Sequence, residues 1–243
     1  MSLTSENLSF AYKKKGGNVL RNITCSFEQG VFYGIFGANG SGKSTLLKLL
    51  AGELNSHGAV RLDNKQVNAF SNRERARHIA VGAQGSELIL PFTVRETIRL
   101  GRYVWDDDGS VLIDRLLQEW ASGDLAERPF AELSGGEQQR VKLLRVLAQD
   151  TDYILLDEPA AALDWNRQLE LYEKLQKIAH GQNKCVIMVC HDLYSAPDFI
   201  DRMLLLKDGS LIYSGTADSD LAKAAVAQAF GRSWAKSAHT KLI

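Results

Sequence analysis

The chain has 243 residues, of which 45% are hydrophobic and 24% charged, as in an ordinary globular protein. Its 29 basic residues balance its 29 acidic ones, which argues against nucleic acid as a partner, since nucleic-acid binding usually needs a basic surface. The sequence shows no apolar run of about 18 residues and no signal-peptide pattern at its start, so we expect a cytoplasmic chain that cannot span a membrane alone.

The first 30 residues alternate apolar and polar positions, most clearly at Leu8–Tyr12 and Ile23–Phe27. This period of two predicts half-exposed antiparallel strands. The charged and glycine-containing stretch 13–17 between them predicts a hairpin turn.

A continuous apolar run, Val31–Phe36, comes next and predicts a strand buried on both faces, as in a parallel sheet. It leads into Gly37-Ala-Asn-Gly-Ser-Gly-Lys-Ser-Thr45, which matches G-x-x-x-x-G-K-[ST], and then into an amphipathic helix over 46–50. Glycines let the backbone N–H groups curl around a phosphate, and the helix that follows adds its positive dipole end. Lys43 supplies a charge for the β and γ phosphates and Ser44 a hydroxyl for Mg²⁺. The segment therefore predicts a nucleoside triphosphate site, with ATP as the ligand.

Residues 93–149 differ from the rest, because helical spacing recurs at 93–100, 111–121 and 138–148 with no clear strand between. We predict a helical subdomain inserted into an α/β core. The acids of Asp106–Gly109 lack companion ligands, so we interpret them as a turn and not as a metal site.

Buried-strand patterns return at Tyr153–Leu156, Val186–Cys190 and Met203–Leu206, and a long amphipathic helix over Trp165–Ala179 links the first two. Alternating helices and apolar strands favour a mainly parallel sheet. An alanine-rich helix is predicted over 220–230, before a polar tail. The three cysteines lie in or beside apolar stretches without a C-x-x-C pair, so we interpret them as small buried residues.

Two acids, Asp157 and Glu158, follow the strand that begins at Tyr153. In a chain with a phosphate loop, a carboxylate at such a strand end is the expected ligand of Mg²⁺, directly or through water, and we assign this role to Asp157. Glu158 is then placed to polarise the attacking water as a general base.

Further motifs make the chain resemble the ABC ATPases. Leu133-Ser134-Gly135-Gly136-Glu137 is similar to the signature motif of that family and lies, as the family requires, between the phosphate loop and the acidic strand. Four other positions resemble family motifs: Tyr12 the aromatic residue that stacks on adenine, Gln84 the Q-loop glutamine, Ala162–Asp164 the D-loop, and His191 the switch histidine.

The resemblance implies an α/β P-loop NTPase core with a mainly parallel sheet, an N-terminal antiparallel β subdomain and an inserted helical subdomain. The whole chain, 1–243, would be one ABC ATPase domain: core over 1–92 and 150–219, helical subdomain with the signature motif over 93–149, and C-terminal helix and tail over 220–243.

The resemblance also implies a head-to-tail homodimer that closes two ATP molecules between its subunits. Ser134 and Gly136 of one copy would meet the γ-phosphate held by Lys43 of the other, His191 would stabilise that phosphate, and Gln84 would sense it and contact Mg²⁺. The expected catalytic residues are Lys43, Gln84, Glu158 and His191, and the expected metal ligands are Ser44, Gln84 and Asp157. The remaining expected nucleotide contacts are Tyr12, Gly37, Asn39, Gly40, Ser41, Gly42, Thr45, Gly135, Glu137 and Asp164.

The stretches 93–96, 100–102 and 191–193 look most like those of iron-chelate, haem and vitamin B12 importer ATPases. This resemblance implies separate transmembrane permease subunits, a substrate-binding protein that acts through them, and a place on the inner face of the cell membrane. Leu88, Ile89 and Phe92 could receive a permease helix or could cap the helical subdomain. The alternatives are an ATPase of another metal-ion importer or exporter, a soluble ABC ATPase of iron–sulfur cluster assembly, a nucleic-acid machine and a non-catalytic nucleotide-binding module.

Overall fold

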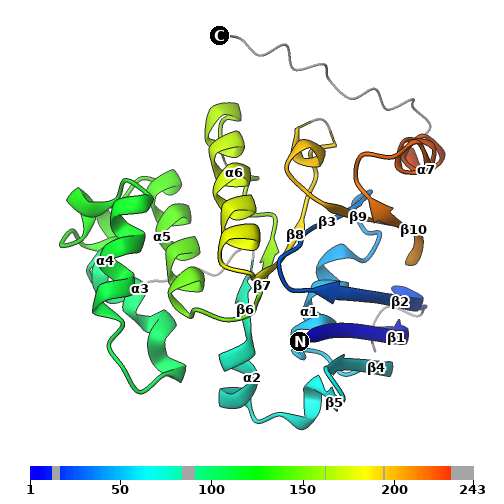
Figure 1. Ribbon diagram of the computed structural model, residues 1–243, viewed down its shortest axis with the longest axis horizontal. Helices are drawn as coiled ribbons and strands as arrows, with labels where there is room; N and C mark the ends of the chain where they lie inside the picture. The colour runs from blue at the N-terminus through cyan, green and yellow to red at the C-terminus, as the bar shows by residue number, and fades with distance from the viewer. Residues whose placement is uncertain (13–16, 84–90, 162, 194, 231–243) are drawn as a thin grey trace.

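The computed structural model describes residues 1–12, 17–83, 91–161, 163–193 and 195–230. Two β-sheets lie beside a separate group of helices (Figure 1). In this part of the chain, no helix is both long enough and apolar enough to cross a membrane.

The smaller sheet is antiparallel and has the strand order β2-β1-β4-β5. Its strands are β1 (Ser2–Phe10), β2 (Leu20–Glu28), β4 (His57–Leu62) and β5 (Lys65–Gln66). The predicted N-terminal strand pair is confirmed, whereas the turn predicted at 13–17 lies mostly outside the described residues. β5 escaped prediction because it has only two residues, both exposed, and β4 because it mixes exposed, half-buried and buried positions.

The larger sheet has the order β10-β9-β3-β8-β7-β6, and all its neighbouring strands are parallel except β10 and β9. Its strands are β3 (Phe32–Gly37), β6 (Ile79–Gly82), β7 (Tyr153–Asp157), β8 (Cys185–Val189), β9 (Arg202–Lys207) and β10 (Ser210–Thr216). The predicted parallel sheet is confirmed, and the antiparallel edge strand β10 is an addition to it.

Both faces of the larger sheet are covered by other elements, and neighbouring residues of β3 belong to different buried clusters on the two faces. Tyr33 and Ile35 join a buried cluster with α1 (Lys43–Leu50) and the smaller sheet. Phe32 and Phe36 point into the opposite cluster, which contains α6 (Trp165–Gly181) and the helical group. α1 is therefore enclosed between the two sheets, as the continuous apolar character of β3 requires.

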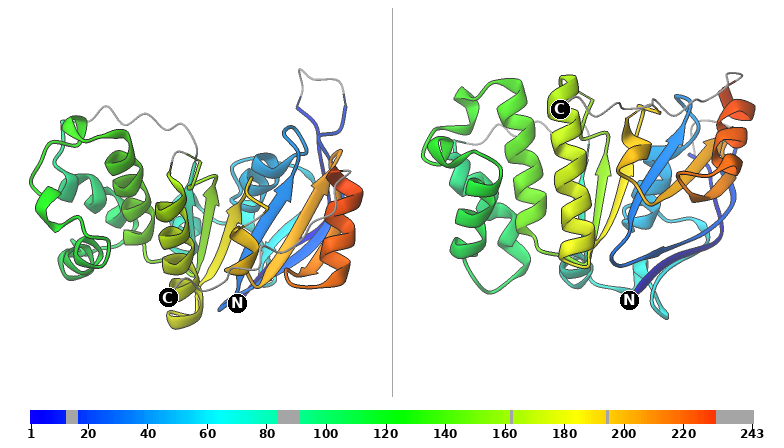
Figure 2. Two further views of the ribbon diagram at one scale, coloured as in Figure 1. Left: turned by 90° about the horizontal axis from the view of Figure 1, so that it is seen from above. Right: turned by 45° about the horizontal axis from the view of Figure 1, so that its top comes forward.

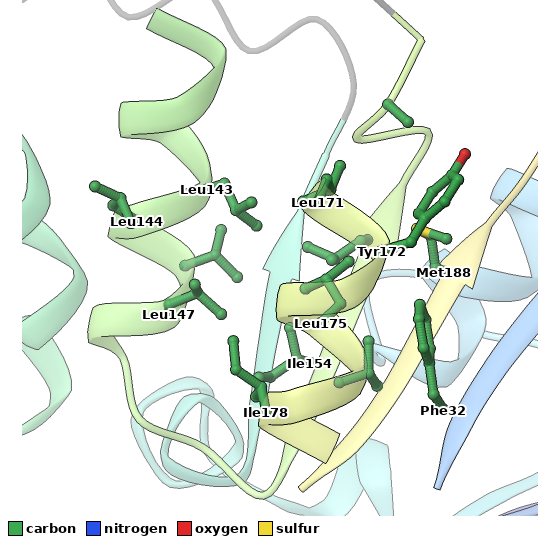
Figure 3. Close-up of a cluster of buried hydrophobic side chains, with 14 of the residues drawn as sticks. Phe32, Leu143, Leu144, Leu147, Ile154, Leu171, Tyr172, Leu175, Ile178 and Met188 are labelled. Atoms are coloured by element: carbon green, nitrogen blue, oxygen red, sulfur yellow. The ribbon is translucent and has the colours of Figure 1, made fainter. Parts of the chain in front are cut away.

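The helical group lies at one side of the larger sheet (Figure 2). It contains α3 (Val94–Arg99), α4 (Ser110–Glu119) and α5 (Gly135–Ala148). α5 packs beside α6 through a cluster that includes Leu143, Leu147, Leu171 and Leu175 (Figure 3). The predicted helices over 93–149 are confirmed, and no strand occurs in the part of 91–149 that the structure describes.

The other helices are α2 (Asn72–His78) and α7 (Asp220–Phe230), and there are 3₁₀ turns η1 (Val67–Ala69), η2 (Leu100–Val104), η3 (Gly123–Leu125), η4 (Phe130–Glu132) and η5 (Ala196–Asp198). α7 was predicted with these bounds. α2 was missed because it buries no residue, although its capping box of Ser71 and Glu74 was a readable signal.

The three thiols are buried, as expected. Burial raises the pKa of Cys25 to about 11 and that of Cys185 and Cys190 well above the usual range. No group of three potential metal-binding side chains occurs among the described residues.

Candidate functional site

The phosphate loop leaves β3 at Gly37 and enters α1 at Lys43. Two of its glycines are required by the structure. Gly42 has a φ of +104°, and a Cβ there would lie 2.5 Å from the Leu20 Cδ2 atom. Gly37 has a φ of +150°, and its Cβ would lie 2.3 Å from the backbone oxygen of Leu206. A side chain at either position would open the loop, so the sequence can form this tight turn only with glycine.

The Lys43 side chain folds back onto the phosphate loop and bonds its backbone. Its ammonium donates to the carbonyl oxygens of Gly37 at 2.9 Å and Ala38 at 3.2 Å. Burial lowers the pKa of Lys43, while the nearby carboxylates of Glu158 and Asp157 oppose that shift. The side chain is only 5% exposed, so this is a desolvated cation held at the mouth of the loop.

Asp157, the last residue of β7, accepts a hydrogen bond from the hydroxyl of Ser44 at 3.0 Å. The carboxylate is buried, and this burial raises its pKa. Its hydrogen bond from Ser44 acts against the shift, and repulsion from Glu158 adds to it. A carboxylate and a hydroxyl thus meet at 3.0 Å beside the phosphate loop.

Glu158 and His191 form an ion pair between Oε1 of the carboxylate and Nε2 of the imidazole. They meet because β7 and β8 are parallel neighbours with Asp157 opposite Val189, so both residues follow the carboxyl end of a strand. Glu158 has a φ of +53°, a strained conformation for a glutamate. Its side chain is 14% exposed and that of His191 43%, so the pair has access to solvent.

An open cleft of about 790 Å³ connects the phosphate loop with Glu158 and His191. The predicted residues that line it are Tyr12, Asn39, Gly40, Gly42, Lys43, Ser44, Thr45, Glu158 and His191. The Tyr12 hydroxyl lies 3.4 Å from the Thr45 hydroxyl, which sets the tyrosine ring over the start of α1. The predicted contacts Gly37, Ser41 and Asp157, all buried, are not among the residues that line this cleft.

Sequence reasoning missed one wall of the cleft. This wall consists of Gly17, Asn18, Val19, Arg21, Asp208 and Gly209. The Asp208-Gly209 pair was readable as a two-residue hairpin turn. The position of this turn beside the cleft could not be predicted from the sequence. It depends on a backbone hydrogen bond from Arg21 N to Gly209 O at 2.8 Å, which joins the two sheets.

The signature residues lie elsewhere. Ser134 precedes α5, and both its backbone N–H and its hydroxyl donate to Glu137, at 2.8 and 2.7 Å. These bonds lower the pKa of Glu137. None of the four residues 134–137 is among those that line the cleft, and α5 stands apart from α1 in Figure 1. Within one chain, therefore, the described residues leave the phosphate loop and the signature motif in separate places.

Asp164 caps α6 by accepting from the backbone N–H of Arg167 at 3.0 Å. Its carboxylate also lies 3.4 Å from the Arg167 guanidinium. Gln84 and Ala162, together with Leu88 and Ile89, fall outside the described residues. Phe92 is described: it is half-buried, and its carbonyl accepts from Phe130 N at 2.9 Å.

Known proteins share both the sequence and the fold. The family model described as "ABC transporter" matches residues 20–161. The hemin import ATP-binding protein HmuV of Escherichia coli O157:H7 is 36% identical over 94% of this chain and 92% of its own length. The iron(3+)-hydroxamate import ATP-binding protein FhuC of Bacillus subtilis (strain 168) is 35% identical over 89% and 82%, respectively. A dimeric post-hydrolysis structure of the ATP-binding cassette MJ0796, bound to ADP and Pi, superimposes with a TM-score of 0.80 at 28% identity and covers 89% of this chain and 99% of that one.

Proposed function

This chain belongs to the ABC transporter family, and on that basis we propose that it is the ATP-hydrolysing subunit of an importer for iron chelates, haem or cobalamin. The observation that carries the proposal is the cleft in which Lys43, Ser44, Glu158 and His191 converge at the carboxyl edge of the parallel sheet. Such edges are where open α/β sheets bind ligands.

ATP enters this cleft with its phosphates in the loop. The backbone N–H groups of residues 39–45 surround the phosphates, and Lys43 contacts the β and γ groups. Tyr12, whose hydroxyl lies 3.4 Å from that of Thr45, stacks on the adenine. The nucleotide thereby brings its γ-phosphate next to the carboxylate–imidazole pair.

Mg²⁺ fits the residues present. Ser44 and Asp157 offer a hydroxyl and a carboxylate 3.0 Å apart, and oxygen ligands of this kind, completed by phosphate oxygens and water, are those that Mg²⁺ prefers. The raised pKa of Asp157 indicates a buried charge that a cation would stabilise. When bound, the ion neutralises charge on the β and γ phosphates. We assign Gln84 to the same ion on family resemblance.

Glu158 accepts a proton from the attacking water, and His191 stabilises the γ-phosphate that the water attacks. Their direct contact lets one network hold both groups in position before the nucleotide arrives. Gln84 would report the presence of the γ-phosphate to the helical group.

A second copy completes the site. The start of α5 is an anion-binding end with Ser134, Gly135 and Gly136 in its first turn, yet it does not line its own chain's cleft. A head-to-tail homodimer brings it to the γ-phosphate bound by the other copy, with Asp164 close to the junction. The dimeric arrangement of the MJ0796 cassette supports this proposal.

The partners of the dimer are transmembrane permease subunits, which place it at the inner face of the membrane, and a substrate-binding protein acts through the permease. The relatives' names concern import of hemin and iron-hydroxamate, which favours an importer over iron–sulfur cluster assembly. We propose the same division of the chain as before: core over 1–92 and 150–219, helical subdomain over 93–149, and C-terminal helix and tail over 220–243.

Coupling to a permease is tested with Phe92→Asp in pull-down against the permease subunits of an iron-chelate, haem or cobalamin importer. We expect loss of permease binding in pull-down and retention of ATP hydrolysis by the separate ATPase. Leu221→Asp is the matched control, because Leu221 is 74% exposed on α7, at the other end of the molecule from the helical group (Figure 1). Retained permease binding by Phe92→Asp contradicts the docking role, and loss of hydrolysis as well means that Phe92 belongs to the core.

A further inference from the structure

The two ends of α5 are held very differently. The helix runs from Gly135, at the nucleotide edge of the sheet, to Ala148, next to the loop that enters β7. Fourteen residues make a rod of about 21 Å. Any tilt of the rod about one end therefore becomes a displacement of several ångströms at the other end.

The C-terminal end of α5 is bonded both to the core, through the Gln149 side chain, and to residues 102 and 105 of the helical group. The Gln149 side-chain amide donates to the carbonyl oxygens of Ile79, at 3.1 Å, and Ala76, which belong to β6 and α2. The Gln149 carbonyl in turn accepts from the Trp105 indole N–H at 2.6 Å. Arg102, which is 8% exposed, donates to the carbonyl of Ala148 at 3.2 Å.

Trp105 is itself in contact with two arginines. The guanidinium carbons of Arg77 and Arg102 lie 5.5 and 5.4 Å from its ring centroid. Arg77 also donates to the carbonyl of Val104 at 3.0 Å, and Arg73 bonds Asp106 at 2.6 Å. Two arginines of helix α2 therefore hold the segment 104–106 by hydrogen bonds. We name Arg73, Arg77, Arg102, Trp105 and Gln149 together the Gln149 clasp.

The backbone is also closely packed at the C-terminal end of α5. A Cβ on Gly101 of η2 would lie 2.1 Å from the Arg145 carbonyl oxygen of α5. At the other end of the helix, a Cβ on Gly136 would meet only the tip of the Arg167 side chain, at 3.2 Å. A small cavity of about 40 Å³ also separates α5 from α6 there. Near this end, Lys174 of α6 contacts the helical group through its ammonium, which donates to the Glu119 carbonyl at 3.0 Å and lies 4.7 Å from the centroid of the Trp120 ring.

We propose that Gln149 and Trp105 are positioning residues for ATP hydrolysis, acting through α5. The clasp is a pivot that holds the C-terminal end of α5 on the core, so that α5 tilts about it and presents Ser134–Glu137 to the ATP of the second copy. This inference rests on the proposed function, because it needs the head-to-tail dimer.

A loosened clasp leaves α5 with many orientations, of which few fit the second copy. Dimer closure must then order the helix, and this cost weakens dimerisation. ATP binding to the single chain is unaffected, because the clasp lies at the opposite end of α5 from the nucleotide edge and contributes no residue to the cleft.

The test uses the full chain with Glu158→Gln, in which ATP-bound dimers are expected to accumulate. Analytical ultracentrifugation with ATP gives the dimer dissociation constant, and a fluorescent ATP analogue gives the affinity of the monomer. Gln149→Ala should raise the dimer dissociation constant roughly three- to thirtyfold. Monomer affinity should change less than about twofold. Trp105→Phe keeps an aromatic side chain but removes the indole N–H, and should shift the dimer constant in the same direction by a smaller factor.

Gln176→Ala is the matched control. Its amide donates to the Phe199 carbonyl at 2.8 Å, so the control also loses a glutamine–backbone bond, but one that does not reach α5. Equal effects of Gln149→Ala and Gln176→Ala on the dimer constant, or no effect of Gln149→Ala, overturn the clasp. Absence of an ATP-dependent dimer in the Glu158→Gln parent overturns the proposed function and this inference with it.

Discussion

Replacing Asp157 by asparagine should stabilise the ligand-free protein while it removes hydrolysis. The carboxylate is 8% exposed, and burial is the largest cause of its raised pKa. Asparagine has the same shape and can still accept the Ser44 hydroxyl bond, now as a neutral bond that is weaker by about 1 kcal/mol. The cost of burying the charge is larger than this loss, although the nearby charges of Lys48 and Lys43 offset part of it.

We expect a net gain of about 1 kcal/mol, typical of relieving an unfavourable functional group. In a chain of this length, that corresponds to a rise in melting temperature of roughly 2–4 °C. The assay is thermal and urea unfolding at pH 7 in the presence of a chelator and without nucleotide. Hydrolysis is measured in parallel with Mg²⁺ and ATP, where the variant should be inactive.

The sign of the pH dependence follows from linkage. Because the pKa of Asp157 is raised on folding from its ordinary 3.8, the folded protein binds this proton more tightly than the unfolded chain. The contribution of Asp157 to stability is therefore complete below 3.8 and is lost as the pH rises through the raised pKa. The advantage of the asparagine variant should be largest at neutral pH and shrink on acidification.

Asp107→Asn is the control, because the pKa of Asp107 is shifted in the opposite direction to that of Asp157. Hydrogen bonds from Arg102 hold the pKa of Asp107 below its usual range. It should not stabilise the protein at pH 7. An Asp157→Asn protein that is less stable than wild type at pH 7 would refute the reasoning, since it would mean that the carboxylate is favourably placed without a cation.

Two further predictions concern the cleft. Glu158→Gln should lower the hydrolysis rate by roughly 10²–10⁴-fold, because the general base is lost, while an ATP-bound dimer accumulates in gel filtration; a monomer that still hydrolyses ATP would exclude Glu158 as the base. Gly209→Ala should lower both the melting temperature and the ATP affinity, because its φ of +78° strains alanine and its Cβ would lie 2.4 Å from the Val19 carbonyl oxygen in the cleft wall. Gly123→Ala, which meets no atom within 4 Å, is the control, and equal effects of the two changes would contradict the proposed role of the wall.

Several elements could be predicted because their signals are local. The phosphate loop needs residue types at fixed spacing, and the strand before it is marked by an unbroken apolar run. Helix α7 was predicted with its observed bounds from composition alone. Strands β4 and β5 carry little such information, because many of their residues are partly or fully exposed, and because β4 depends on β1 for pairing and β5 on β4.

The sequence by itself determined the chemistry of this protein: the glycines, Lys43, Ser44 and the acids after β7 have to be these residue types wherever the chain places them. Only the tertiary structure decided what stands around them. It brought Asp208 and Gly209 to the cleft through one backbone bond between sheets, and tied α5 to α2 through Gln149, which donates to Ala76, and Trp105, which lies beside Arg77. The physical reason is that motifs reflect local chemical needs, whereas these contacts join residues far apart in the chain, each ordinary in its own segment.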